Sequence, residues 1–203
     1  MTANSSGTNQ PRTATIERKT SETQVRVSVN LDGTGRAQVQ TGIGFLDHML
    51  DALSRHGRID LELACTGDLH IDDHHTAEDC ALALGACLRE ALGDKRGIMR
   101  FGHAYAPLDE ALARAVVDLS GRAHATIELG LSRRSIGELA CENVPHFFRS
   151  LAMELRCALH LDVLRGENDH HRAEAATKAL ALALRQAIAR TGHDDIASTK
   201  GSL

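Results

Sequence analysis

The sequence predicts an α+β fold made of two similar halves, each with a small mixed β-sheet that helices cover on one face. A motif is repeated, because His-His-x-x-Glu occurs at 74–78 and again at 170–174. A histidine precedes each copy at a similar distance, with His48 26 residues before the first and His146 24 residues before the second. The two halves also share one order of segments, in which strands, a helix, a further strand and a long helix follow one another. Duplication of one α+β half explains all three observations.

In the first half, residues 25–29 alternate apolar and polar side chains, as a half-buried strand does. A helical pattern begins near 44–50, and residues 59–63 alternate again. The long helix begins at His74 and ends near residue 92, in a segment rich in alanine and leucine. The acidic pair 72–73 directly before it suits a helix N-cap.

The second half repeats this order. Residues 115–117 form a short apolar run and residues 123–129 alternate, so both predict strands. A helical pattern follows Pro145, and residues 159–163 alternate again. The second long helix begins at the repeated motif and ends near residue 188, after an Asn-Asp pair that also suits an N-cap.

These segments divide the chain into four parts. We expect a disordered N-terminal tail at 1–11, a first α+β half at 12–95, a second at 96–193, and a C-terminal phosphate-binding loop and tail at 194–203. The boundary between the halves falls near 94–97, where the first long helix has ended.

Composition excludes several classes of protein. A formal net charge of −4 provides no basic field for nucleic acid. No apolar run approaches the roughly 18 residues that span a bilayer, and the N-terminus lacks the apolar core of a signal peptide. The five cysteines are odd in number and form no CxxC, which favours reduced thiols over disulfides or zinc thiolates. We therefore expect a cytoplasmic protein without nucleic-acid or membrane partners.

The repeated motif predicts two metal sites. Helical residues four apart share a face, whereas adjacent residues diverge by about 100°. The first histidine and the glutamate of each motif can therefore chelate one ion, while the second histidine points elsewhere. By symmetry, each pair would be joined by the second histidine of the other half and by an upstream histidine. The predicted sites are His74, Glu78, His171 and His146, and His170, Glu174, His75 and His48. Geometry fixes the assignment of the two upstream histidines less firmly.

Three imidazoles and one carboxylate suit manganese, iron or zinc, and spacing does not choose among them. The alternative is that paired histidines cap helices or line a polar core. Other catalytic signatures are absent from the sequence, including HExxH, GxSxG, a Walker loop and GxGxxG before a helix.

Weaker signals indicate anion binding and acid–base chemistry. Residues 198–201, Ser-Thr-Lys-Gly, combine hydroxyls, a cation and a flexible glycine that can hold a phosphate, although an ordinary polar tail has the same composition. Arg100 and Arg122 stand at predicted element boundaries and could add cationic contacts. Glu22 and Asp109 are conceivable proton acceptors, but their sequence context assigns neither a role.

Four motifs in order carry a resemblance to a known family: GFLDHM (44–49), DDHHTAED (72–79), NDHHRAE (168–174) and STKG (198–201). Together they resemble imidazoleglycerol-phosphate dehydratase over residues 12–201. The resemblance implies a monofunctional dehydratase of histidine biosynthesis that converts D-erythro-imidazole-glycerol phosphate to imidazole-acetol phosphate and water. It also implies two manganese ions per active site, which bind the imidazolate ring where subunits meet, and a 24-subunit octahedral homo-oligomer. The fused phosphatase domain of some members is not expected, because no DxDxT motif is present.

The resemblance also assigns roles to residues. One manganese goes to His48, His75, His170 and Glu174, and the other to His74, Glu78, His146 and His171. Glu22 and Glu174 would transfer protons, with Asp109 as an assistant. The residues implied in substrate binding, with the phosphate held mainly by the arginines and the C-terminal loop, are Glu22, His48, His56, His74, Glu78, Arg100, Arg122, His170, Lys178, Ser198, Thr199 and Lys200. Ala52 departs from the pattern, because some members have a glutamine there that contacts phosphate.

Two other functions remain compatible with the residues alone. A metal-binding assembly protein would use the histidines to join subunits without catalysis. A metallohydrolase would release phosphate or cleave an ester of a phosphorylated metabolite.

Overall fold

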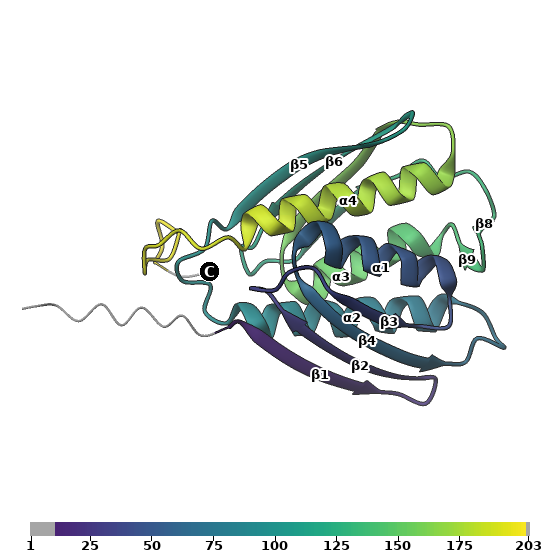
Figure 1. Ribbon diagram of the computed structural model, residues 1–203, viewed down its shortest axis with the longest axis horizontal. Helices are drawn as coiled ribbons and strands as arrows, with labels where there is room; N and C mark the ends of the chain where they lie inside the picture. The colour runs from purple at the N-terminus through teal and green to yellow at the C-terminus, as the bar shows by residue number, and fades with distance from the viewer. Residues whose placement is uncertain (1–10, 202–203) are drawn as a thin grey trace, which may run out of the picture.

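Two four-stranded sheets form the outer layers of the protein, and four helices lie between them (Figure 1). The computed structural model describes residues 11–201. The sheet of the first half consists of β1 (Thr13–Lys19), β2 (Thr23–Asn30), β3 (Ala37–Gln40) and β4 (Asp60–Gly67). The sheet of the second half consists of β5 (Phe101–Leu108), β6 (Ala111–Asp118), β7 (His124–Glu128) and β10 (Ala158–Arg165).

Strand order confirms the predicted duplication. The first sheet has the order β1-β2-β4-β3 and the second β5-β6-β10-β7. In both, the first three strands pair antiparallel, and the last strand pairs parallel with its neighbour. A short hairpin of β8 (Ser135–Ile136) and β9 (Leu139–Ala140) is an addition of the second half. The α+β class with mixed sheets covered by helices on one face is therefore confirmed.

Each half contributes one shorter and one longer helix. These are α1 (Gly44–Gly57) and α2 (His74–Leu92) in the first half, and α3 (Asn143–Leu155) and α4 (Asp169–Ala187) in the second. The longer helix covers the sheet of its own half. The shorter helix packs against the longer helix of the other half, so that α1 lies along α4 and α3 along α2. The two halves therefore exchange contacts throughout the helical layer.

Close packing of this layer depends on small side chains. The buried face of α4 is almost continuous alanine, and α2 presents alanines and buried cysteines to its neighbours. A Cβ at Gly85 would lie 2.8 Å from the carbonyl oxygen of Leu151, so α2 and α3 meet there almost backbone to backbone. Four of the five cysteines are buried and all are free, which confirms the expectation of reduced thiols.

The strands that sequence analysis did not single out are β1, β3 and β5, together with the two-residue strands β8 and β9. In β1 the sequence TATIERK contains few apolar side chains, and residues of this edge strand are at most partly buried. An edge strand buries little surface, so its apolar signal is weak. The predicted tail at 1–11 lies outside the described residues except for Pro11, and so do residues 202–203 of the predicted C-terminal part. Within the described range, no helix combines the length and apolar character that crossing a bilayer requires.

The contact between α4 and β5 generates a test of this packing. A Cβ at Gly102 would lie 1.9 Å from the carbonyl oxygen of Ala183, so Gly102→Ala must push the helix away from the sheet. We expect the free energy of unfolding to fall by about 1–3 kcal/mol, the usual cost of overpacking. Denaturant unfolding monitored by circular dichroism measures this loss.

Gly57→Ala is the matched control, because a Cβ there would lie 3.6 Å from the carbonyl oxygen of Ala181 on the same helix α4. That distance is an ordinary contact, so the control variant should retain wild-type stability. Equal stability of both variants would contradict the packing described here.

Candidate metal centres

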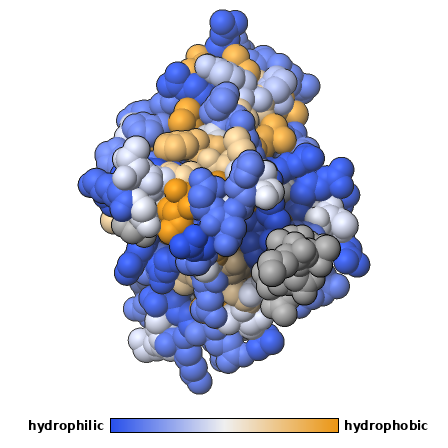
Figure 2. Space-filling model, turned by 90° about the vertical axis from the view of Figure 1, so that its left-hand side faces the viewer, coloured by the Kyte–Doolittle hydropathy of each residue, from blue (hydrophilic) through white to orange (hydrophobic). Residues whose placement is uncertain are grey.

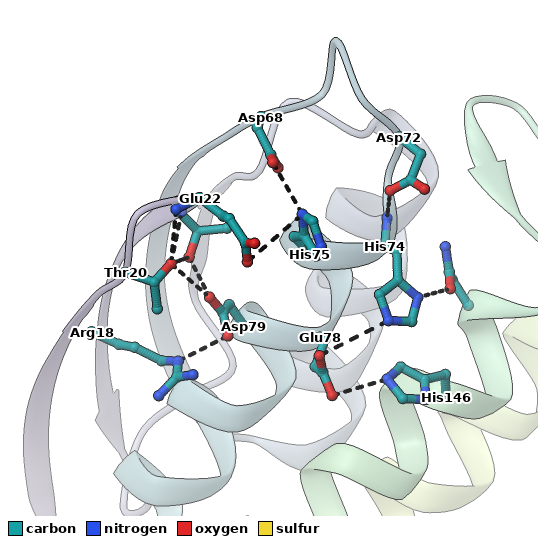
Figure 3. A network of polar contacts seen from close by, with 12 residues as sticks. Arg18, Thr20, Glu22, Asp68, Asp72, His74, His75, Glu78, Asp79 and His146 are labelled. Carbon is teal, nitrogen blue, oxygen red and sulfur yellow. Dashed lines mark hydrogen bonds and ion pairs between the residues drawn. The ribbon is translucent and has the colours of Figure 1, made fainter.

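The first cluster forms where α3 of the second half crosses the start of α2. His74 and Glu78 lie one helical turn apart on α2, and His146 reaches them from α3. Glu78 has its carboxylate 3.1 Å from Nε2 of His146 and 3.9 Å from Nε2 of His74 (Figure 3). The buried side chain of Asn143 accepts a hydrogen bond of 2.9 Å from Nδ1 of His74, which turns the other ring nitrogen toward Glu78.

The second cluster repeats this arrangement where α1 of the first half crosses the start of α4. The Oε2 atom of Glu174 is 3.0 Å from Nε2 of His48 and 3.2 Å from Nε2 of His170. Lys178, one turn further along α4, places its ammonium 2.7 Å from the other oxygen of Glu174. Burial opposes ionisation of this carboxyl, but Lys178 and His48 outweigh burial and lower the pKa of Glu174 to about 2.

In each cluster the possible ligand atoms lie within 4.8 Å of one another. Two imidazole nitrogens and a carboxylate oxygen at that spacing fit a divalent transition metal such as manganese, iron or zinc. One difference between the two sets is that Leu82 follows Glu78 by one turn, where Lys178 follows Glu174. The predicted i, i+4 pairs and the upstream histidines therefore come together in the chain.

The second histidine of each motif points away from its cluster. The rings of His74 and His75 are inclined at 75°, and those of His170 and His171 at 88°. This divergence matches the helical geometry that the sequence predicted. Within the chain, therefore, each cluster holds three of the four predicted ligands. The sequence predicted that the second histidine of the other half completes each set. Inside one chain it does not, because that histidine faces away from the contact between the halves.

A carboxylate orients each of these two histidines instead. His75 donates from Nδ1 to Asp68 at 3.0 Å, and the carboxylate of Glu22 lies 3.8 Å from the same nitrogen (Figure 3). His171 donates from Nδ1 to Glu110 at 2.7 Å. The pKa of His75 is raised, chiefly by the hydrogen bond to Asp68, and the pKa of His171 is raised, chiefly by that to Glu110. A histidine bonded through Nδ1 to a carboxylate leaves Nε2 available as a metal ligand.

Close approach of β4 to α2 brings Asp68 to His75. A Cβ at Gly67, the last residue of β4, would lie 2.1 Å from the hydroxyl of Thr76 on the first turn of α2. In the second half the orienting carboxylate comes from a different place, because Glu110 belongs to the turn between β5 and β6. Backbone N–H groups of Asn168 and Glu167 bond to Glu110, and with His171 they lower its pKa to about 2.

The helix starts confirm the predicted capping residues in part. Asn168 accepts a hydrogen bond from the backbone N–H of His170 at 2.9 Å. Asp72 accepts the corresponding bond from His74 at 2.9 Å, whereas the adjacent Asp73 bonds to the backbone N–H of Ala140 instead.

The candidate phosphate residues lie at the other end of the molecule. Arg100 forms an ion pair of 2.7 Å with Asp118 and donates to the carbonyl oxygen of Ala197, which fastens the C-terminal segment. The backbone N–H of Arg100 also bonds to Ala187 at the end of α4. The cluster of His170 and Glu174 lies in the first turns of this 19-residue helix, about 20–25 Å from Ala187 at 1.5 Å per residue. Figure 2 faces the side of the molecule on which α4 ends, and there hydrophilic residues dominate the surface around smaller hydrophobic areas.

The remaining predicted residues divide between the two ends. Arg122 is exposed in the loop after β6, and Thr199 and Lys200 are exposed in the C-terminal segment, where Ser198 accepts a hydrogen bond from the backbone of Lys200. Lys178 lies with Glu174 rather than with these residues. His56 is on α1, where burial and the nearby charge of Lys178 lower its pKa. Ala52 is buried in α1.

Two predicted acid–base residues occupy equivalent hairpin turns. Glu22 lies in the turn between β1 and β2, beside His75, and Asp109 lies in the turn between β5 and β6, with its carboxylate 3.9 Å from Nε2 of His171. Glu22 does not reach the cluster of Glu174 within the chain. The orienting residues Asp68, Glu110 and Asn143 were not identified from sequence.

Of these three, only Asn143 carried a usable signal, since it precedes His146 by three residues and shares its helix face.

Comparisons with known proteins agree on one family. Residues 41–184 match the family described as imidazoleglycerol-phosphate dehydratase. A protein of that name from Phytophthora nicotianae is 59% identical over 192 residues, which are 95% of this chain but 42% of that longer protein. The Salinibacter ruber protein of that name is 56% identical over 95% of this chain and 96% of its own. The crystal structure of the Staphylococcus aureus dehydratase is similar with a TM-score of 0.80 at 36% identity, over 88% of this chain and 99% of that chain.

The raised pKa of His75 predicts a pH-dependent contribution to stability. The pKa of the folded state lies above the ordinary value of 6.5, so protonation of His75 beside Asp68 stabilises the fold. This stabilisation is complete below the unfolded pKa and disappears as the pH rises through the folded pKa. Asp68→Asn should therefore destabilise the metal-free protein more at pH 5.5 than at pH 8.5. Denaturant unfolding with a chelator present measures both differences, and an equal loss at the two pH values would refute the assignment.

Proposed function

This chain belongs to the imidazoleglycerol-phosphate dehydratase family, and on that premise we propose that two manganese ions serve its reaction, one at each histidine–glutamate cluster. The family identifies it as an enzyme of histidine biosynthesis and a carbon–oxygen lyase. The observation that carries the proposal is the pair of three-ligand clusters, His48 with His170 and Glu174, and His74 with Glu78 and His146. The substrate is D-erythro-imidazole-glycerol phosphate, and the products are imidazole-acetol phosphate and water.

The fourth ligand of each cluster comes from a second copy of the chain. His75 and His171 are each held by a carboxylate through Nδ1, so Nε2 is the nitrogen that remains for a metal. Neither ring lies in a cluster of its own chain. His75 of one copy completes the set of His48, His170 and Glu174 in another, and His171 completes the set of His74, Glu78 and His146. This arrangement makes metal binding and assembly into a 24-subunit octahedral particle depend on each other.

Two manganese ions, when bound, act as Lewis acids that stabilise negative charge on the imidazole ring of the substrate. The chain supplies the proton transfers. Dehydration removes a hydroxyl from the carbon attached to the ring and a proton from the next carbon, and the resulting enol becomes the ketone of the product. Glu22 is the proposed proton acceptor, because it is half-exposed and adjoins His75. Delivery of His75 to another copy brings Glu22 to that copy's Glu174, the second proposed proton-transfer residue.

The C-terminal segment binds the phosphate. Lys200, Ser198 and Thr199 provide a cation and hydroxyl donors, and Arg122 in the nearby loop adds a second cation. Arg100 bonds to Ala197, so it fixes the segment as well as contributing charge. Because this end is about 20–25 Å from the cluster of His170 and Glu174 along α4, the phosphate and the ring of one substrate molecule are held by different copies of the chain. His56 and Lys178 line the ring-binding side, next to Glu174.

Replacement of either cluster glutamate tests the two metal sites. We expect two manganese ions per chain in the purified enzyme and about one in Glu78→Gln or Glu174→Gln, because an amide is a weaker ligand than a carboxylate. Mass spectrometry of the metal content measures this, and turnover should fall at least about 100-fold in both variants. Glu17→Gln, at an exposed ion pair with Arg26 on the outer face of the sheet, is the control that should keep both ions.

Product analysis of the same preparations distinguishes dehydration from hydrolysis. The product of dehydration is lighter by one water and keeps its phosphate, whereas a hydrolase releases phosphate. Absence of turnover in fully manganese-loaded enzyme would contradict the proposed reaction, and the metal-binding assembly protein would then be the better explanation.

Lys200→Ala tests the phosphate site separately. Loss of a charge-assisted hydrogen bond is worth about 1.5–3 kcal/mol, so KM should rise about 10- to 100-fold. Metal content and particle size should be unchanged, which steady-state kinetics, metal analysis and light scattering can establish. Lys200→Arg keeps the charge and should retain a KM within about threefold of wild type. A wild-type KM for Lys200→Ala would remove this residue from the site.

A further inference from the structure

A buried carboxylate on α2 has no part in the reaction proposed above. Asp79 is 6% exposed and lies four residues after His75, so both side chains project from the same face of the helix. That face is turned toward the hairpin of β1 and β2, whose turn carries Glu22 (Figure 3). One turn of α2 therefore presents His75 and Asp79 to the same segment of chain.

Asp79 fastens this hairpin turn through several hydrogen bonds. Arg18 donates from Nε to one carboxylate oxygen at 2.9 Å, and the hydroxyl of Thr23 donates to the other. Thr20 approaches that second oxygen with its hydroxyl at 3.5 Å. These three residues flank Glu22 on both sides in the sequence. The carboxylate thus holds the last residues of β1, the turn and the first residue of β2 to the helix.

The hydroxyl of Thr20 continues this connection to Glu22 itself. It accepts hydrogen bonds from the backbone N–H groups of Glu22 at 3.1 Å and Thr23 at 3.0 Å. The hydroxyl of Thr20 therefore fixes the backbone of Glu22, while the side chain of Glu22 extends to within 3.8 Å of His75. A glutamate at a hairpin tip would otherwise sample many conformations and lose entropy on each productive alignment.

The duplicated half shows that the fold does not require this carboxylate. In the second half Ala175 occupies the position of Asp79, one residue after the glutamate of the motif, and it is completely buried. The corresponding hairpin between β5 and β6 has a turn of two residues, and Glu110 in that turn bonds to the N–H groups that precede α4. Burial of a charge is costly unless it is well hydrogen-bonded, and alanine at the same place avoids that cost. Asp79 therefore has a role that is specific to the first hairpin and is not required by the fold.

We propose that Asp79 is a positioning residue for catalysis, which holds the β1–β2 turn through Thr20 and Thr23 so that Glu22 stays beside His75. This inference rests on the proton-transfer role proposed for Glu22. It assigns no contact with the substrate to Asp79. The expected consequence is a loss in kcat without a matching change in KM, because the turn affects the alignment of Glu22 and not the phosphate contacts.

A double-mutant cycle in the assembled, manganese-loaded enzyme tests the proposal. Asp79→Ala and Thr20→Val should each lower kcat about 10- to 100-fold with KM within about twofold of wild type. In a Glu22→Gln background the same changes should lower the residual kcat by less than about twofold, because the group that they position is already absent. Thr20→Ser keeps the hydroxyl and should restore wild-type kcat.

Thr15→Val is the matched control on the same pair of strands. It removes the 2.7 Å hydrogen bond between Thr15 and Ser28, away from the turn, and should leave kcat unchanged. Metal content and particle size, measured on every variant, should match wild type. If Asp79→Ala does not fold, Thr20→Val at the turn decides the question alone.

The outcomes separate this inference from the proposed function. Wild-type turnover in Glu22→Gln would overturn the role of Glu22 and the positioning role with it. A strong loss in Glu22→Gln together with wild-type kcat in Thr20→Val would overturn the positioning role only. An equal loss from Asp79→Ala in both backgrounds would also overturn it, because Asp79 would then act independently of Glu22.

Discussion

The packing of each shorter helix against the longer helix of the other half is the contact on which both histidine–glutamate clusters depend. His48 reaches Glu174 because α1 lies along α4, and His146 reaches Glu78 because α3 lies along α2. Small residues in the helical layer allow this approach, as at Gly85 and Leu151. Neither half could assemble three ligands alone, since each contributes only a His/Glu pair to one cluster and one histidine to the other. Each cluster therefore exists only where the two halves pack against each other.

Duplication explains what the halves share, and the differences between them indicate where function acts on one half alone. Each motif has a second histidine oriented by a carboxylate, but that carboxylate follows β4 in the first half and belongs to the β5–β6 turn in the second. Lys178 accompanies Glu174, whereas Leu82 follows Glu78. Asp79 secures the first hairpin, whereas Ala175 packs at the same place in the second. A repeated backbone thus carries two unequal sites, as expected if only one glutamate doubles as metal ligand and proton-transfer group.

The length of the helices explains why the proposed enzyme needs several copies of its chain. The cluster of His170 and Glu174 lies at the start of α4, and Arg100 with the C-terminal segment lies beyond its end. A rigid helix of this length keeps the two ends apart, so no local movement brings them together within one chain. At the other end of the molecule, His75 and His171 point outward from their own clusters. Their orientation also indicates that a second copy of the chain is needed. Assembly is therefore part of the proposed active site.

The sequence by itself determined the duplicated α+β class, the two long helices and the six clustered candidate ligands, because i, i+4 spacing and binary patterning are local properties of the chain. It also predicted that adjacent histidines diverge. Tertiary structure alone decided that His75 and His171 lie outside the clusters of their own chain, that Asp68, Glu110 and Asn143 orient the imidazoles, and that the candidate phosphate residues of the C-terminal segment lie far from the clusters. These depend on how β4, the hairpin turns and α3 approach the helices, and contacts between distant segments leave no periodic signal in sequence. The weakly apolar edge strand β1 was missed for the same reason, since its place is set by pairing with β2.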